Sequence, residues 1–235
     1  TGKMLPIPAW GTQLLSSGKP AITILQQHGP VNLVGVIGKT RCGLFDEGNE
    51  CDFCMMNGGV TNEERTVDEI CECFNLALDD KAAYNLTLTT SILTNQDKEK
   101  LIEDVKRIRA RLPKKTPLAI ETQPIETDYM RQLKAAGVDT LMIPLDCASA
   151  EAQSHFVPGK KDLLQKLYWE TMPEAVALYG SGNVTSSIIV GLEPQFETIE
   201  AIRQMINIGI VPEPVPVRWD NSKFTENAIR TATDP

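Results

Sequence analysis

The sequence predicts an α/β fold with parallel strands, built as a partial TIM-like barrel of six strand–helix units, (β/α)6. Strand-like and helix-like segments alternate along most of the chain, a pattern that favours right-handed crossovers between parallel strands. Neither G-x-G-x-x-G nor G-x-x-x-x-G-K-[ST] follows a strand, and six units are too few for a full eightfold barrel. An open doubly wound sheet is the alternative.

The first unit flanks a loop rich in cysteine, glycine and acidic residues. Residues 31–38, VNLVGVIG, are a short apolar, β-branched run that ends at Gly38, as expected for a buried strand. Residues 66–78 are predicted to form a helix, because Thr66 is a suitable N-cap and Glu69 stands three residues after it.

The alternation continues through the middle of the chain. Residues 84–92, YNLTLTTSI, and 117–122, PLAIET, are strand-like. Residues 95–112 carry apolar side chains at helical spacing, which predicts an amphipathic helix. Residues 128–137 read as a helix closed by a glycine, and residues 139–146, DTLMIPLD, as the next strand.

In the last strand–helix units of the predicted barrel, prolines mark where helices and strands break or end. A long helical region covers residues 161–179, in which Pro173 marks a break or a new first turn. Residues 184–191, VTSSIIVG, are a predicted strand and residues 196–209 a helix that ends in glycine. Residues 211–219, VPEPVPVRW, form an extended segment limited by prolines.

Composition narrows the class of protein. No linker divides the 235 residues, so we expect one domain: an N-terminal extension at 1–30, the barrel at 31–219 and a C-terminal segment at 220–235. The net charge of −8 argues against a broad nucleic-acid surface. No apolar run approaches the about 20 residues of a membrane span, and no signal peptide is evident, so we expect a cytoplasmic protein without membrane contact.

The loop after the first predicted strand holds Cys42, Cys51 and Cys54 with the spacing C-x8-C-x2-C. Loops at the carboxyl ends of parallel strands build the active face of such folds, and C-x2-C lets two thiolates bind one metal or cluster. Three thiolates leave one position open, as in catalytic sites. His28 is expected at the opposite end of the barrel, whereas His155 remains open as a fourth ligand. A zinc-binding knob is the alternative.

The stretch CGLFDEGNECDFC resembles the cluster-binding loop of the radical S-adenosylmethionine (radical SAM) superfamily. That pattern is C-x3-C-x2-C with an aromatic residue before the last cysteine, and Phe53 stands there; the first gap has eight residues instead of three. The resemblance implies a [4Fe–4S] cluster on Cys42, Cys51 and Cys54, with S-adenosylmethionine (SAM) chelating the fourth iron.

Other segments resemble the biotin synthase and lipoyl synthase group. The resemblance places these residues at SAM: Phe53 beside the cluster, Thr89, Thr90 and Ser91 at the amino group, Asp146 at the ribose, Ile189, Gly191 and Glu193 near the adenine, and Val215 to Val217 along it. Pro144 replaces an asparagine of biotin synthase that contacts the ribose. Glu121 and Gln123 leave the third strand at the same edge, where contact with SAM or substrate and a solvated turn are both open.

The resemblance implies an enzyme that cleaves SAM reductively and abstracts hydrogen from a small or carrier-bound substrate. Sulfur insertion is the first hypothesis for the next step, although Thr185 and Ser186 stand where a cysteine of biotin synthase is expected. A ferredoxin or flavodoxin would supply electrons, and a second subunit would supply a second cluster. The alternative is a non-catalytic zinc- or cluster-binding assembly protein. No catalytic side chain is assigned.

For the remaining cysteines and the basic residues, the sequence allows both a structural role and a functional role. Cys71 and Cys73 are expected to pack in the core rather than hold an auxiliary iron–sulfur cluster. Cys147 is expected to be a small apolar filler, with an auxiliary-cluster ligand as the alternative. Lys160-Lys161 is expected to cap or to be solvated at the start of a helix rather than to bind a phosphate or carboxylate. For Arg218, a salt bridge and a substrate carboxylate are both open.

Overall fold

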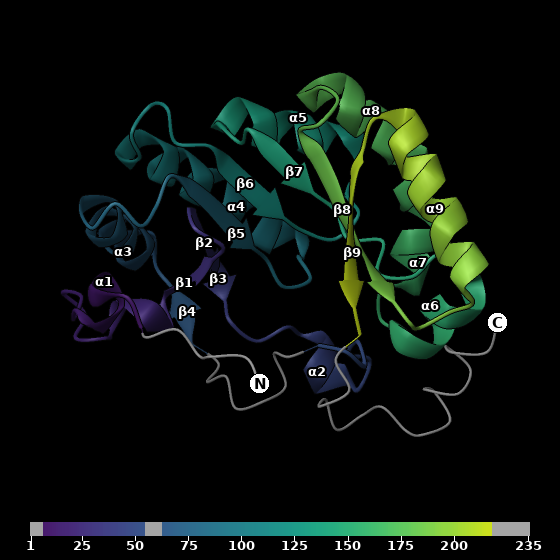
Figure 1. Cartoon of the computed structure of the whole chain (residues 1–235), viewed down its shortest axis with the longest axis horizontal. Coiled ribbons are helices and arrows are strands. Elements are labelled where there is room, and N and C mark those ends of the chain that lie inside the picture. Colours follow the sequence, from purple (N-terminus) through teal and green to yellow (C-terminus); the bar gives the residue numbers. More distant parts are fainter. Residues whose placement is uncertain (1–6, 55–62, 218–235) are drawn as a thin grey trace.

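Seven strands form one curled sheet in the computed structural model, which describes residues 7–54 and 63–217 (Figure 1). In sheet order these are β1 (Leu25–His28), β2 (Asn32–Val36), β5 (Asn85–Thr89), β6 (Leu118–Glu121), β7 (Thr140–Met142), β8 (Val184–Val190) and β9 (Val211–Pro216). Strands β2, β5, β6, β7, β8 and β9 run parallel to one another. Strands β3 (Gly38–Lys39) and β4 (Glu64–Arg65) form a separate two-stranded antiparallel sheet. Arg218 and the predicted segment 220–235 lie outside the described residues.

Helices surround the outside of the curled sheet (Figure 1). They are α1 (Ala9–Thr12), η1 (Ala21–Thr23), α2 (Leu44–Glu47), α3 (Val67–Asp79), α4 (Asn95–Arg111), α5 (Thr127–Ala136), α6 (Ala150–Phe156), α7 (Lys161–Leu163), the π-helical turn η3 (Leu164–Tyr168), α8 (Trp169–Tyr179) and α9 (Gln195–Ile208). Across residues 7–54 and 63–217, none of these helices has both the length and the apolar character needed to cross a bilayer.

The partial barrel of six parallel strands is confirmed, and three of the differences in its elements have a physical reason. The expected extension contributes β1, which pairs antiparallel with β2; its sequence LQQH has one apolar residue, so it shows no alternating apolar pattern. The predicted strand at 139–146 ends at Met142, directly before the loop that carries Pro144. Pro173 lies inside α8, and the irregularity is the π-helical turn upstream of it.

The strands present two different faces because side chains alternate along them. Toward the helices they place fully buried apolar side chains, among them Leu33, Leu86, Leu88, Leu118, Ile120, Leu141, Val184 and Ile188. Toward the concave side they place the intervening residues, among them Val34, Thr87, Ala119, Thr140, Thr185 and Glu213. The core therefore lies between the sheet and the helices, and the inside of the curl is lined mainly by small or polar groups.

Strand β9 is one edge of the sheet, and prolines occupy every second position in it. The amide of Val217 donates to the carbonyl oxygen of Val190 at 3.0 Å, so the odd-numbered amides face β8. The even-numbered positions Pro212, Pro214 and Pro216 face outward and have no N–H to donate. A further strand cannot form a regular ladder there, and the barrel stays open.

Helix α3 begins with the predicted capping box. The Thr66 side chain accepts from the Glu69 amide at 3.2 Å, and the Glu69 carboxylate accepts from the Thr66 amide at 3.1 Å.

We expect Thr66→Ala to lower the free energy of unfolding by about 1 kcal/mol, because the Glu69 amide in the first turn of the helix loses its acceptor. Chemical denaturation followed by circular dichroism measures this. Thr66→Ser keeps the hydroxyl and is the control; equal losses in both variants would contradict a capping role.

Candidate functional site

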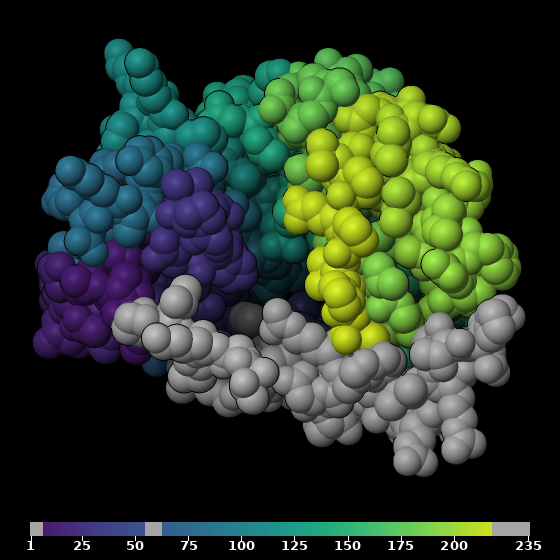
Figure 2. All heavy atoms as spheres, viewed as in Figure 1, coloured from purple at the N-terminus to yellow at the C-terminus, as the bar shows by residue number. Residues whose placement is uncertain are grey.

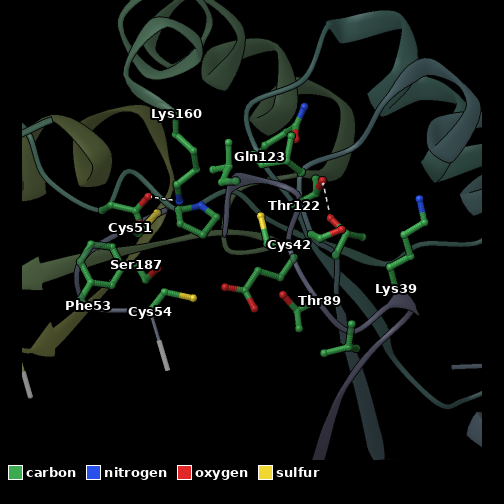
Figure 3. A pocket seen from close by; sticks show the side chains of 18 of the residues that line it. Lys39, Cys42, Cys51, Phe53, Cys54, Thr89, Thr122, Gln123, Lys160 and Ser187 are labelled. Carbon is green, nitrogen blue, oxygen red and sulfur yellow. Dashed lines mark hydrogen bonds and ion pairs between the residues drawn. The ribbon is translucent and has the colours of Figure 1, made fainter. Parts of the chain in front are cut away.

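A cavity of about 320 Å³ opens at the carboxyl ends of the parallel strands. Cys42, Cys51 and Cys54 all line it, as do Phe53, Thr89, Thr90, Ser91, Glu121, Gln123, Pro144, Asp146, Lys160, Ser187 and Ile189. Figure 3 shows the three cysteines around the same space as Thr89 and Lys160. Residues predicted from five separate stretches of the sequence are thus brought together at one edge of the sheet.

The eight-residue gap between Cys42 and Cys51 is a folded unit. Its centre is the single helical turn α2, closed by Gly48 in the left-handed conformation (φ +70°). Leu44 is buried, and its carbonyl oxygen accepts from the Asn49 amide at 2.9 Å. A tight turn then follows, in which the Cys54 amide donates to the Cys51 carbonyl at 3.0 Å.

This folded gap packs against the segment from Phe156 to Lys160. The Asp52 amide donates to the Phe156 carbonyl at 2.9 Å, and the Gly159 amide donates to the Asn49 carbonyl at 3.1 Å. A Cβ atom on Gly159 would lie 2.5 Å from the Asn49 oxygen and 2.6 Å from a Leu44 methyl carbon. Glycine is therefore required for this close approach, which seats Lys160 beside the cysteines.

Lys160 and Asp146 form an ion pair in the cavity wall (Figure 3). Only 15% of the Lys160 side chain and 5% of the Asp146 side chain are exposed. Burial by itself disfavours the lysine charge, but the neighbouring Asp146, Cys51 and Glu121 together outweigh it, Asp146 foremost, and raise the pKa of Lys160. Lys160 does stand at the start of a helix, at the N-cap of α7, but the expectation that its side chain is solvated is wrong. Its signal in the sequence was weak, because only the glycine before it marks a close contact.

Asp146 itself has an unusual backbone. Its φ is +63°, which is uncommon for a residue other than glycine. Its carbonyl oxygen accepts from the Ile189 amide at 2.6 Å, and its amide donates to the Ser187 carbonyl at 3.1 Å. These bonds to β8 hold the turn after β7, so the carboxylate faces the cavity.

The loops after β5 and β6 provide the polar wall opposite Lys160. The hydroxyl of Thr90 donates to that of Thr122 at 3.0 Å, and the Gln123 side-chain oxygen accepts from the Leu93 amide at 2.8 Å. Gln123 thereby fixes the loop after β5. Burial raises the pKa of the Glu121 carboxyl, which a hydrogen bond from Thr89 opposes.

Four residues assigned to the adenine region do not line this cavity. Glu193 is buried, and its carboxylate accepts from the amides of Ala148 at 2.9 Å and Ser149 at 2.8 Å. Gly191 lies beyond the end of β8 and Val217 directly after β9, while Val215 faces a second cavity. Their contact with adenine stays a prediction.

The other cysteines do not line the cavity. Cys71 and Cys73 are buried in α3, which confirms their core packing, and Cys147 is fully buried. His155 is exposed on α6 and does not line the cavity. His28 pairs with Asn32, the first residue of β2, so it lies at the amino ends of the parallel strands, opposite to the cavity. Burial raises the pKa of the Cys51 thiol to about 12, although Lys160 acts in the opposite direction.

The three cavity cysteines do not converge on a single point. Among residues 7–54 and 63–217, no three His, Cys, Asp or Glu side chains are grouped closely enough to hold one metal ion. A tetrahedral zinc draws its thiolates together, since each Zn–S bond is only about 2.3 Å long. Thiolates on different irons of a cluster stand further apart. The donor set, three thiols around one cavity, suits a thiolate-bound metal centre, either an iron–sulfur cluster or a zinc ion.

Known proteins share this fold. The structure of HydG, a maturase of the [FeFe]-hydrogenase from Carboxydothermus hydrogenoformans, aligns over 87% of this chain with a TM-score of 0.64 and 15% identity. Methylornithine synthase (PylB) aligns over 84% with a TM-score of 0.64 and 16% identity. At these identities the similarity shows a common fold, a partial TIM-like barrel.

One sequence relative covers nearly the whole chain. Bacteriochlorophyllide c C-7(1)-hydroxylase of Chlorobaculum limnaeum is 22% identical over 248 residues, which include 92% of this chain and 61% of that protein. The chain spans 49% of HydG and 56% of PylB. It is thus similar to about half to three fifths of each of these proteins. The sequence matches no protein-family model.

The Lys160–Asp146 pair gives a stability prediction. We expect Lys160→Met to lower the free energy of unfolding by about 3 kcal/mol, because it leaves the Asp146 charge buried without a partner. Urea denaturation measures this loss. Asparagine adopts the left-handed backbone conformation of position 146 readily. The double variant Lys160→Met/Asp146→Asn, which removes both charges, is therefore the matched control and should regain at least half of the lost free energy of unfolding. A double variant as unstable as Lys160→Met would contradict the charge pairing.

Proposed function

We propose that this chain provides the catalytic barrel of a radical SAM enzyme. Cys42, Cys51 and Cys54 would hold a [4Fe–4S] cluster and leave one iron for SAM. When bound, the cluster and SAM supply reductive cleavage to methionine and a 5′-deoxyadenosyl radical, which abstracts hydrogen from the substrate. The observation that carries the proposal is the placement of three cysteines, and no fourth described cysteine, around one cavity at the active edge.

The residues around the cysteines would bind and orient SAM. Hydroxyls and carbonyls at Thr89, Thr90 and Ser91 suit its amino group, and the Asp146 carboxylate suits the ribose hydroxyls. Lys160 acts as a positioning residue, since its ion pair holds that carboxylate. The apolar side chain of Ile189 also lines the cavity. Such a wall helps to exclude water from a reactive radical.

The step after hydrogen abstraction has two candidates. Sulfur insertion rests on the resemblance to biotin and lipoyl synthases and needs a second cluster, for which the described cavity offers no further cysteine; a second subunit would have to bring it. Hydroxylation is favoured by the relative that covers 92% of this chain. Both use a cytoplasmic electron donor of the ferredoxin or flavodoxin type. The non-catalytic assembly protein remains the rival.

The test is anaerobic purification followed by assay of iron, sulfide and SAM cleavage. We expect about four irons and four sulfides per chain, a brown protein, and 5′-deoxyadenosine once the protein is reduced with dithionite in the presence of SAM. Chromatography quantifies the nucleoside. A colourless protein with one zinc would overturn the proposal, and a brown protein that never cleaves SAM would favour the assembly protein.

Two single substitutions distinguish a cysteine that binds the proposed cluster from one that does not. Cys42→Ala should lower 5′-deoxyadenosine formation at least a hundredfold and reduce iron content, because two thiolates hold the cluster poorly. Cys71→Ala, at a buried position in α3 outside the cavity, should retain both within about twofold. Persistent cleavage in Cys42→Ala would show that the ligands are wrongly assigned.

A further inference from the structure

A second, larger cavity of about 530 Å³ lies along the concave face of the sheet. We propose that it is the substrate cavity and that it takes a small polar substrate with a cationic nitrogen, such as a primary amine. This inference rests on the proposed function, because the cavity adjoins the proposed SAM site. Its lining comes from all seven strands of the sheet or the residues beside them.

The register of the sheet explains why this space is hollow. Thr87 lies between Val34 on β2 and Ala119 on β6, and Ala119 in turn pairs with Thr140 on β7. Further along the sheet, Met142 on β7 pairs with Thr185 on β8. A closed barrel fills its interior with layers of bulky branched residues. Here threonine and alanine occupy most of these positions, so the interior keeps room for a ligand of ordinary size.

The charges that line the cavity are negative. Glu121 and Glu213 face it, and its lining includes no lysine or arginine. Burial raises the pKa of Glu121, a hydrogen bond from Thr89 and the charge of Lys160 oppose this shift, and the charges of Asp146 and Glu213 add to it. Lys160 lines the other cavity and is paired with Asp146. A cationic group on the substrate would relieve the repulsion between the carboxylates, whereas an anionic substrate would increase it.

Hydroxyl groups complete the lining. Thr87, Thr140 and Ser187 face the cavity. Thr185 faces it too, and its hydroxyl oxygen is buried without a hydrogen-bond partner among the described residues. A buried hydroxyl without a partner is costly, so this group favours a ligand that supplies a donor or acceptor. The cavity is therefore suited to a substrate with several polar groups.

Two residues join the cavity to the proposed cofactor site. Glu121 and Ser187 line both spaces, so a ligand on the concave face would reach the place where the radical is expected to form. Figure 2 shows a hollow between the purple N-terminal part and the yellow strand β9. The lining likewise includes His28 of β1 and Glu213 of β9, the two edge strands. A substrate can thus enter through the open side of the barrel.

The test compares two four-carbon probes of opposite charge on the reconstituted holoenzyme. We expect 1,4-diaminobutane to bind at least tenfold more tightly than succinate in ligand-observed NMR titrations. Glu213→Gln should weaken diamine binding about tenfold, because it removes one carboxylate without changing its shape. The control is Glu200→Gln on α9, where the carboxylate is 73% exposed; it should leave diamine binding unchanged.

The outcomes separate this inference from the proposed function. Succinate binding as tightly as the diamine to the unaltered protein would overturn the inference, whether or not the variant folds. Diamine binding unaffected by Glu213→Gln would also overturn it. The same preparation is assayed for 5′-deoxyadenosine: SAM cleavage without diamine binding refutes only this inference. Diamine binding without SAM cleavage refutes the proposed function and leaves the charge selectivity of the cavity standing.

Discussion

The alternation of side chains along the six parallel strands determines both the core and the cavities. Strands β2, β5, β6, β7 and β8 send fully buried leucine, isoleucine or valine toward the helices and mainly small or polar residues toward the concave side, whereas the edge strand β9 has no buried residue. A slip of one residue in any strand would exchange these sets. Thr87, for example, would then face the helix layer, and Leu88 would fill the space that the substrate is proposed to occupy. One register therefore supports both stability and function.

The site depends on two loops that lie far apart in the sequence. The helical turn between Cys42 and Cys51 packs on Gly159, where any larger residue would meet the Asn49 carbonyl. This contact brings Lys160 to Asp146, whose strained backbone turns its carboxylate to the cavity. The long gap in the cysteine motif thus has a structural role. It supports the loop that completes the wall beside the proposed cluster.

The open side of the barrel follows from its two edge strands. The outward positions of β9 are prolines, which donate no hydrogen bond, and β1 runs antiparallel to its neighbour. Neither edge continues the parallel ladder, so the sheet curls without closing. Among the residues that the structure describes, the hollow is lined from both edge strands, and it is there that a polar ligand is proposed to reach the inner face.

The sequence by itself determined the alternating strands and helices, the capping box at Thr66 and the joint position of the three cysteines at one edge. These features follow from local periodicity, local hydrogen bonds and the rule that parallel strands end at the same edge. The tertiary structure alone decided the antiparallel β1, the Lys160–Asp146 pair and the hollow inner face. Each depends on residues brought together from distant segments: pairing partners, close packing at Gly159 and strand register leave no local pattern along the chain.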